Sequence, residues 1–233
     1  MKIKFLLKLI TLCLFQISSD IYTTAFSSSS GLDLEICFSP LEKSHYSLLL
    51  KWLSSKHVHD WWYTHVQWTP ELIAKLYDSY VEGFILEKGV RAPVYPYIVS
   101  IKDIFEEVPI GFVEYYDVKA SPSEFSYDFN ILEKLASSLL AKNIAGFDIF
   151  IGEEAFCNRG FGRKIIKEFF RNCVFQRFDF CISLIDTKNT RSIRVFEKIG
   201  CEIIGKHHYT DCSKRDCSGV VMIAHSSKFE NKG

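Results

Sequence analysis

Apolar positions along this chain alternate between two spacings, one typical of strands and one typical of helices. Compact apolar runs at residues 145–152 and 180–185 predict strands. Apolar residues recur at helical spacing at residues 163–173 and again at residues 189–199, where Gly200 ends the second helix. Strands that alternate with helices predict an α/β fold built in layers.

The first half of the chain adds elements of both kinds. A strand is expected at residues 34–39, where Pro40 ends it. A helix is expected next, with Leu48, Leu49, Trp52 and Leu53 on one face. Thr69 and Pro70 suit the N-cap and first position of a helix that is predicted to run to about Glu87. Residues 119–142 read as partly helical and partly irregular. Further strands are expected at residues 97–102, 110–118, 202–208 and 219–224.

Residues 1–31 are expected to be an appendage and linker in front of one domain at residues 32–233. The appendage holds a hydrophobic stretch with lysines and then a serine run that ends at Gly31. This is similar to a secretory signal cut near Ala25; a membrane-surface helix, an organelle-targeting peptide and an over-extended start site stay open as alternatives. The apolar run is short for a transmembrane helix, so membrane contact is expected only through residues 1–31.

Composition narrows the class of protein. The chain has 233 residues, of which 48% are hydrophobic, which is enough for one domain with a full core. Lysine plus arginine and aspartate plus glutamate each number 28, so the net charge is zero and nucleic acid is not an expected partner. The eight cysteines are scattered, and no pair at zinc spacing accompanies Cys212 and Cys217. We therefore expect buried, reduced thiols and no metal.

A glycine loop stands between the strand at 145–152 and the helix at 163–173. Its sequence is Cys157-Asn158-Arg159-Gly160-Phe161-Gly162, and two glycines one residue apart allow a tight turn close to a ligand. The free N–H groups at a helix N-terminus favour phosphate, and Arg163 adds positive charge. The alternative interpretation is an ordinary turn, because short glycine motifs are weak signals.

A second motif strengthens the ligand interpretation. Residues 189–200 read NTRSIRVFEKIG, one predicted strand after RGFG. Together, the two segments resemble the acetyl-CoA-binding motifs of the GNAT superfamily of N-acetyltransferases. The resemblance implies a mixed, curved central sheet flanked by helices, with acetyl-CoA as co-substrate. It also implies a cytoplasmic location, since acetyl-CoA is a cytosolic or organellar compound. The sequence leaves the oligomeric state open.

The resemblance also implies which residues hold the donor. Loop amides would bind the CoA pyrophosphate, although Cys157 stands where the family usually has Gln or Arg. Asn189 would contact the pantetheine arm, with a helix N-cap as the alternative. Most relatives have Tyr at position 196 to protonate the CoA sulfur, which Phe196 cannot do. The expected donor-binding set is Phe150, Ile151, Cys157, Asn158, Arg159, Gly160, Phe161, Gly162, Arg163, Asn189 and Phe196.

Three acidic residues are candidates for deprotonating the acceptor amine. Asp148 is the first, since an acid within an apolar strand costs free energy unless it is paired or used; the alternative is that it faces solvent. Asp186, at the end of the next strand, is the second, with a turn as its alternative role. Glu114 is the third and is expected to face the substrate rather than act as the base.

Four segments narrow the resemblance further. Residues 57–62 (HVHDWW), 96–99, 109–112 and 146–148 recur in this order in aminoglycoside 6′-N-acetyltransferases. Residues 151–156 are also similar to siderophore-biosynthesis lysine N-acyltransferases, which usually have His where this chain has Asp148. The resemblance implies acetylation of an aminoglycoside-like amine, an antibiotic-resistance activity. The alternatives are a siderophore-type acyl transfer and a CoA-binding module without turnover. The expected substrate-binding set is Trp61, Trp62, Tyr97, Glu114 and Asp117, with core packing as the alternative for the tryptophans.

Overall fold

The computed structural model describes residues 34–87, 89–120, 143–210 and 216–229. The predicted appendage at residues 1–31 therefore lies outside the described residues. So does nearly all of the stretch at residues 119–142 that was expected to be partly helical. The predictions for both segments stay predictions.

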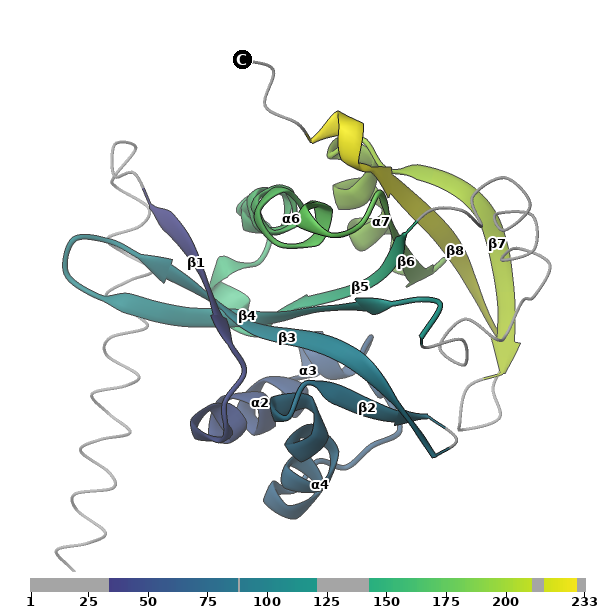
Figure 1. Ribbon diagram of the computed structural model, residues 1–233. Helices are drawn as coiled ribbons and strands as arrows, with labels where there is room; N and C mark the ends of the chain where they lie inside the picture. Colours follow the sequence, from purple (N-terminus) through teal and green to yellow (C-terminus); the bar gives the residue numbers. More distant parts are fainter. Residues whose placement is uncertain (1–33, 88, 121–142, 211–215, 230–233) are drawn as a thin grey trace, which may run out of the picture.

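Eight strands form a sheet in the order β1-β3-β4-β5-β6-β8-β7, and β2 pairs with the start of β3 (Figure 1). Every pair is antiparallel except β5 with β6, which is parallel. The sheet is therefore mixed, as predicted. The strands are β1 Glu35–Pro40, β2 Phe84–Glu87, β3 Val90–Lys102, β4 Glu107–Asp117, β5 Ile144–Ile151, β6 Phe180–Asp186, β7 Glu202–Thr210 and β8 Asp216–His225.

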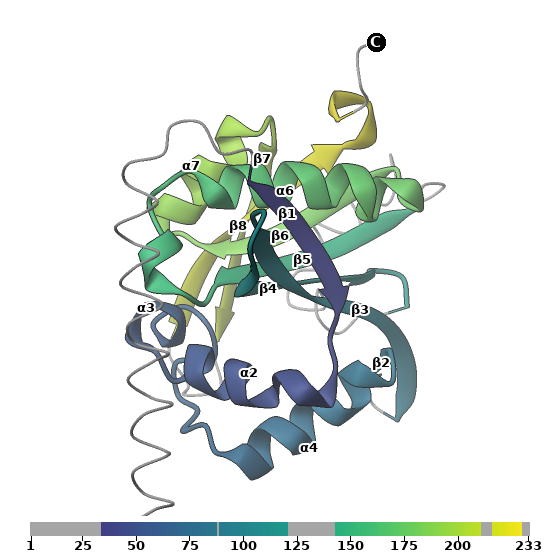
Figure 2. The same cartoon turned by 90° about the vertical axis from the view of Figure 1, so that its left-hand side faces the viewer.

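Helices cover both faces of the sheet. On one face lie α2 (Tyr46–Leu53), α3 (Lys56–His59) and α4 (Pro70–Val81), and on the other lie α6 (Phe161–Asn172) and α7 (Thr190–Lys198) (Figure 1 and Figure 2). A core cluster lies between the sheet and α6, and another lies between the sheet and α2 and α4. This arrangement confirms the predicted layered α/β class.

The structure corrects the predicted helix from Thr69 to about Glu87. Thr69 is the N-cap, with its hydroxyl accepting from the N–H of Leu72, but α4 ends at Val81. Gly83 follows with a left-handed φ of 82°, a conformation that glycine adopts without steric cost. The apolar residues after it form β2 instead of a last helical turn.

β3 is longer than predicted, because it begins at Val90 instead of residue 97. The longer strand includes Pro96, although proline has no N–H to give to a strand ladder. In the structure, the carbonyl of Pro96 accepts from the N–H of Leu41 at 3.0 Å, just beyond the last residue of β1. The missing N–H therefore lies past the end of the neighbouring ladder, and the strand tolerates the proline.

The parallel pair of β5 and β6 is short. Ile144, Ala145 and Gly146 pair with residues 180–182, and the pairing ends there although both strands continue. β5 runs on to Ile151 while it stays paired with β4. The second half of β5 thus has one edge in the sheet and one edge that β6 does not cover.

Candidate active site

The open edge of β5 borders a cleft of about 390 Å³ that also touches α3, the first turn of α6 and one face of α7. We call it the helix cleft. Arg159 and Phe161 are not part of its lining: Arg159 is exposed, and the ring of Phe161 packs on Phe156 with 5.5 Å between centroids. The other residues expected to hold the donor line it: Phe150, Ile151, Cys157, Asn158, Gly160, Gly162, Arg163, Asn189 and Phe196.

The entry into α6 leaves backbone donors for a ligand. Asn158 and Gly160 have left-handed φ angles of 62° and 86°, which turn the chain sharply into the helix. Gly160 is the N-cap and no side chain caps this helix. The N–H groups of the first turn have no carbonyl partner within the helix, and Arg163 adds positive charge beside them. This end of the helix cleft therefore suits an anionic group such as a phosphate.

Asn189 is a helix N-cap and also lies in the helix cleft, so the two roles considered for it are compatible. Its Oδ1 accepts from the N–H of Ser192 at 3.1 Å, which makes it the N-cap of α7, and the residue also lines the helix cleft. Phe196 lies further along α7. Its side chain is only 3% exposed, and its ring centroid lies 6.2 Å from that of Phe147. α7 and its N-cap thus present both polar and apolar side chains to the same cleft.

Cys157 stands at the entrance of the glycine loop and is half-buried. Burial raises the pKa of its thiol, while Arg191 on α7 acts in the opposite direction. The thiol is therefore mainly protonated at neutral pH, and it forms part of the lining of the helix cleft.

A second cleft, of about 340 Å³, opens on the side of the sheet that carries α4 and β2. We call it the aromatic cleft. Trp61 and Trp62, in the segment between α3 and α4, line both clefts, so the two adjoin there. Trp62 also packs edge-on against Phe150 at 5.0 Å, so it combines the lining and core roles. The complete lining is Trp61, Trp62, Tyr63, Tyr80, Ile85, Val94, Glu114, Tyr116 and Asp148.

The aromatic cleft brings together two of the predicted acids. Asp148 on β5 is directly paired with Glu114 on β4. Glu114 is only 7% exposed, whereas Asp148 is half-buried. Tyr116 lies beside them, with its ring over Gly146: a Cβ on that glycine would stand 2.4 Å from the ring. The cleft is thus acidic at its base and aromatic at its sides, which suits a cationic ligand.

Three residues predicted for catalysis or substrate binding are not brought to either cleft. Asp186 ends β6, where its Oδ1 accepts from the N–H of Lys188 at 2.7 Å, the turn role weighed as its alternative. Asp117 ends β4 and accepts from the N–H of Lys119 at 2.8 Å. Tyr97 lies on the α6 side of the sheet, where its ring meets Phe169 at 5.4 Å.

Several residues that line the two clefts were not among those predicted from the sequence. Arg191, Val195 and Lys198 line the helix cleft, and their spacing from one another (i, i+4, i+7), which puts them on one face of α7, was the available signal. For the aromatic cleft, Tyr63, Tyr80 and Tyr116 carried no comparable signal, since they come from three separate segments. Their convergence is a property of the packed fold.

With this geometry established, comparison with known proteins identifies the family. The model of the Acetyltransferase (GNAT) domain matches residues 42–209, most of the chain. The chain belongs to the GNAT acetyltransferase family. It is therefore an acyltransferase whose donor is acetyl-CoA. This confirms the family, the enzyme class and the donor that residues 157–162 and 189–200 together predicted.

Solved structures show the same fold at low sequence identity. Aminoglycoside acetyltransferase AAC(6′)-Ib in complex with coenzyme A and kanamycin is 20% identical, with a TM-score of 0.61 over 85% of this chain and 99% of that one. An aminoglycoside N(6′)acetyltransferase from Legionella pneumophila is 16% identical (TM-score 0.58; 88% and 100% covered). Spermidine N-acetyltransferase from Vibrio cholerae, with CoA and spermine, is 15% identical (TM-score 0.55; 83% and 97% covered).

None of the helices within the described ranges has the length and apolar character needed to cross a membrane. In the same part of the chain, the histidines, cysteines and acids form no group of three that could hold a metal ion.

Proposed function

We propose that this GNAT protein acetylates a primary amine of a small, polycationic acceptor of the aminoglycoside type. The observation that supports this most is the adjoining of the two clefts at Trp61 and Trp62, with a carboxylate pair in the second cleft. One cleft offers backbone donors and Arg163 to an anionic donor molecule. The other offers carboxylates and aromatic rings to a cation.

In the helix cleft, the residues present fit the chemistry of acetyl-CoA. The uncapped first turn of α6 and Arg163 would hold the pyrophosphate, and Asn189 would contact the pantetheine arm. The open edge of β5 at Ile149 and Ile151 would bind the arm and polarise the thioester carbonyl through backbone N–H groups, and Phe150 would line the cleft beside them. Cys157, Asn158 and Gly160 would shape the turn around the phosphates.

In the aromatic cleft, Asp148 would take a proton from the acceptor ammonium, directly or through a water. The freed amine nitrogen would then form a bond to the thioester carbon, and the carbon–sulfur bond would break. The nitrogen would lose its second proton to water as the amide forms. Phe196 has no proton to give, so the CoA thiolate would leave as such or take up that second proton through water; a thiol pKa near 8.5 makes this tolerable. Glu114, Trp61 and Trp62 would hold the cationic acceptor.

Titration with acetyl-CoA together with a thiol-release assay over a panel of amines tests this function. The panel contains kanamycin, spermidine, a hydroxylated lysine and a neutral amine such as phenethylamine. We expect saturable acetyl-CoA binding and the highest kcat/KM for a polycationic amine. A preference for the hydroxylated lysine would favour the siderophore-type reaction. Binding without release of thiol on any amine would instead identify a CoA-binding module.

A further inference from the structure

Two carbonyl groups on the open edge of β5 are each taken by a side chain from another element. The hydroxyl of Ser183 on β6 donates to the carbonyl of Phe147 at 2.9 Å, in a buried position. The Nε2 of His57 on α3 lies 3.1 Å from the carbonyl of Ile151. Because a carbonyl can only accept, Nε2 carries the hydrogen in this bond.

These two bonds bracket a single residue. Every second residue of a strand turns its N–H and C=O to the same edge, so Phe147, Ile149 and Ile151 share the edge that faces away from β4. Side chains occupy the first and the last of the three carbonyls, whereas Ile149, midway between them, lines the helix cleft. The peptide groups of Ile149 are thus held next to the space that β6 has left.

An open strand edge tends to pair with whatever strand is near it, and β6 is the nearest candidate. The pairing of β5 with β6 ends at Gly146, immediately before the residue whose carbonyl Ser183 binds. At the other end of the open edge, the carbonyl of Ile151 has no hydrogen-bond donor from β6, and His57 supplies one instead. Both side chains therefore satisfy carbonyls that would otherwise favour closure of the gap.

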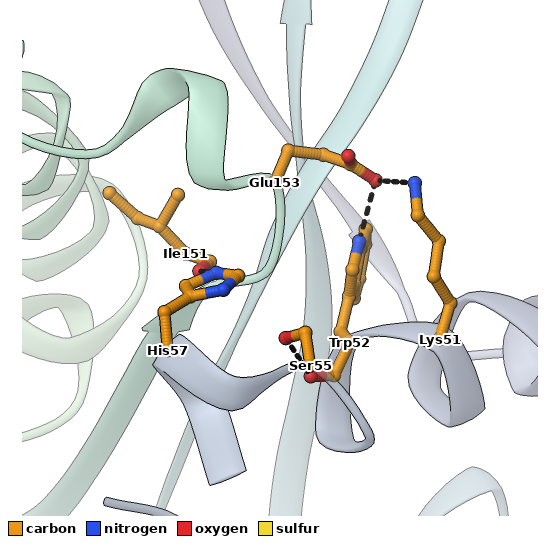
Figure 3. Close-up of polar contacts among 6 residues, drawn as sticks. All are labelled: Lys51, Trp52, Ser55, His57, Ile151 and Glu153. Carbon is orange, nitrogen blue, oxygen red and sulfur yellow. Dashed lines mark hydrogen bonds and ion pairs between the residues drawn. The ribbon is translucent and has the colours of Figure 1, made fainter. Parts of the chain in front are cut away.

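The end of β5 that His57 contacts is also tied to α2 (Figure 3). From α2, the indole Nε1 of Trp52 and the Nζ of Lys51 both reach Oε1 of Glu153, at 2.7 Å and 2.5 Å. Gly152 lets the Trp52 ring come this close, since a Cβ there would stand 2.2 Å from the ring. The segment after β5 is thus fixed to α2, and α3 follows α2 directly.

We propose that His57 and Ser183 are positioning residues that keep β5 apart from β6 and so keep the peptide groups of Ile149 open to the acetyl-CoA arm. This inference rests on the proposed function, because it assigns that arm to the helix cleft. His57 acts through the Ile151 carbonyl as a donor and takes no proton from the substrate.

The test compares His57→Leu with His57→Gln, because a Gln amide can donate to the Ile151 carbonyl without being a base. We expect His57→Leu to weaken CoA binding and to raise the KM for acetyl-CoA about tenfold, as loss of a hydrogen-bond donor to a partly buried carbonyl implies. The KM for the acceptor should change far less. His57→Gln should restore most of the affinity and leave the pH profile of kcat as in the wild type.

His59→Leu is the matched control. His59 lies on the same helix, and its Nε2 meets the carbonyl of Val66 at 3.0 Å, outside the helix cleft. This variant should lose a similar amount of thermal stability and keep its acetyl-CoA KM within about twofold. Ser183→Ala should behave like His57→Leu, with a raised acetyl-CoA KM.

Two outcomes overturn the inference. If His57→Gln is as impaired in kcat as His57→Leu and loses a limb of the pH profile, then His57 is a base and not a positioning donor. If His57→Leu keeps the wild-type affinity for CoA while the wild type is active, the hydrogen bond from His57 to Ile151 has no role in binding acetyl-CoA. A wild type that does not bind acetyl-CoA would overturn the proposed function itself, which keeps the two failures distinct.

Discussion

Asp148 on β5 stands directly opposite Glu114 on β4, and both side chains reach the aromatic cleft. Like charges directly opposite each other on neighbouring strands repel, so a cation that binds between them relieves that repulsion. The two acids differ in exposure, since Glu114 is nearly buried and Asp148 is half-buried. The more accessible Asp148 is therefore suited to exchange protons, and Glu114 to hold charge.

Replacing Asp148 with Asn should separate chemistry from donor binding. Asn keeps the size and shape of the side chain, but one acceptor oxygen becomes an NH2 donor and the amide cannot accept a proton from an ammonium group. We expect kcat to fall at least about tenfold, as for loss of a general base, with CoA affinity near that of the wild type. Steady-state kinetics and titration with CoA measure the two quantities. Unchanged turnover would remove Asp148 from the mechanism.

Glu114→Gln should act on the acceptor instead. Loss of the buried charge removes an attraction to a cation, so the acceptor KM should rise on the order of tenfold while kcat changes less. A neutral amine in the same assay is the control, because its KM should be insensitive to this change. Equal effects on the cationic and the neutral amine would show that Glu114 has only a structural role.

Much of the fold was predictable because its elements carry local signals. Short segments of sequence were enough to predict the glycine loop, the N-cap at Thr69 and the apolar face of α6. The end of α4 was missed because Phe84 and Ile85 continue an apolar pattern that fits a helix as well as a strand. What decides between them is the pairing with β3, which no short window contains.

The candidate site divides in the same way. Asp148 stood out as an acid within an apolar strand, and register then placed it opposite Glu114. Tyr97 was expected at the substrate because of its motif, yet strand alternation turns it to the α6 side. Asp186 was a candidate for deprotonating the amine because it ends a strand, and in the structure it accepts a hydrogen bond within a turn. Which face a side chain takes depends on register, and register depends on tertiary packing.

Gly160→Asp should abolish CoA binding. The residue caps α6 with a left-handed φ of 86°, and no atom within 4 Å would meet a Cβ, so the side chain itself has space. The carboxylate would place negative charge beside the predicted pyrophosphate position. Gly160→Asn is the matched control, since Asn has the same shape, tolerates this φ and is neutral. We expect Asn to retain binding within about tenfold of the wild type. Equal loss in both variants would point to backbone strain instead.

Gly152→Ala should destabilise the whole domain. A Cβ at this position would lie 2.2 Å from the Trp52 ring, and Trp52 is fully buried between α2 and the sheet. Overpacking of this kind typically costs about 1–3 kcal/mol of unfolding free energy, measured by urea denaturation. In Gly162→Ala, the added methyl would stand 3.8 Å from Ile151 and Val195. That control should be neutral, or stabilising by about 0.5–1 kcal/mol.

Alkylation of Cys157 tests whether the helix cleft is where the donor binds. Burial raises the pKa of this thiol, and burial also raises that of Cys173, which lies at the end of α6 outside both clefts. Because only the thiolate reacts, a raised pKa lowers the reactive fraction at any pH below it. Both cysteines should therefore react slowly with iodoacetamide at neutral pH. Their rates should still be climbing at a pH where an ordinary thiol has levelled off.

Acetyl-CoA should then distinguish the two cysteines. A donor seated in the helix cleft covers Cys157, so saturating acetyl-CoA should slow alkylation at this position on the order of tenfold, in proportion to the bound fraction. Cys173 should react at the same rate with and without the donor, which controls for general tightening of the fold. Peptide mapping by mass spectrometry follows each site in one sample. Protection of both cysteines, or of neither while titration shows saturation, would place the donor elsewhere and contradict the assignment of the helix cleft.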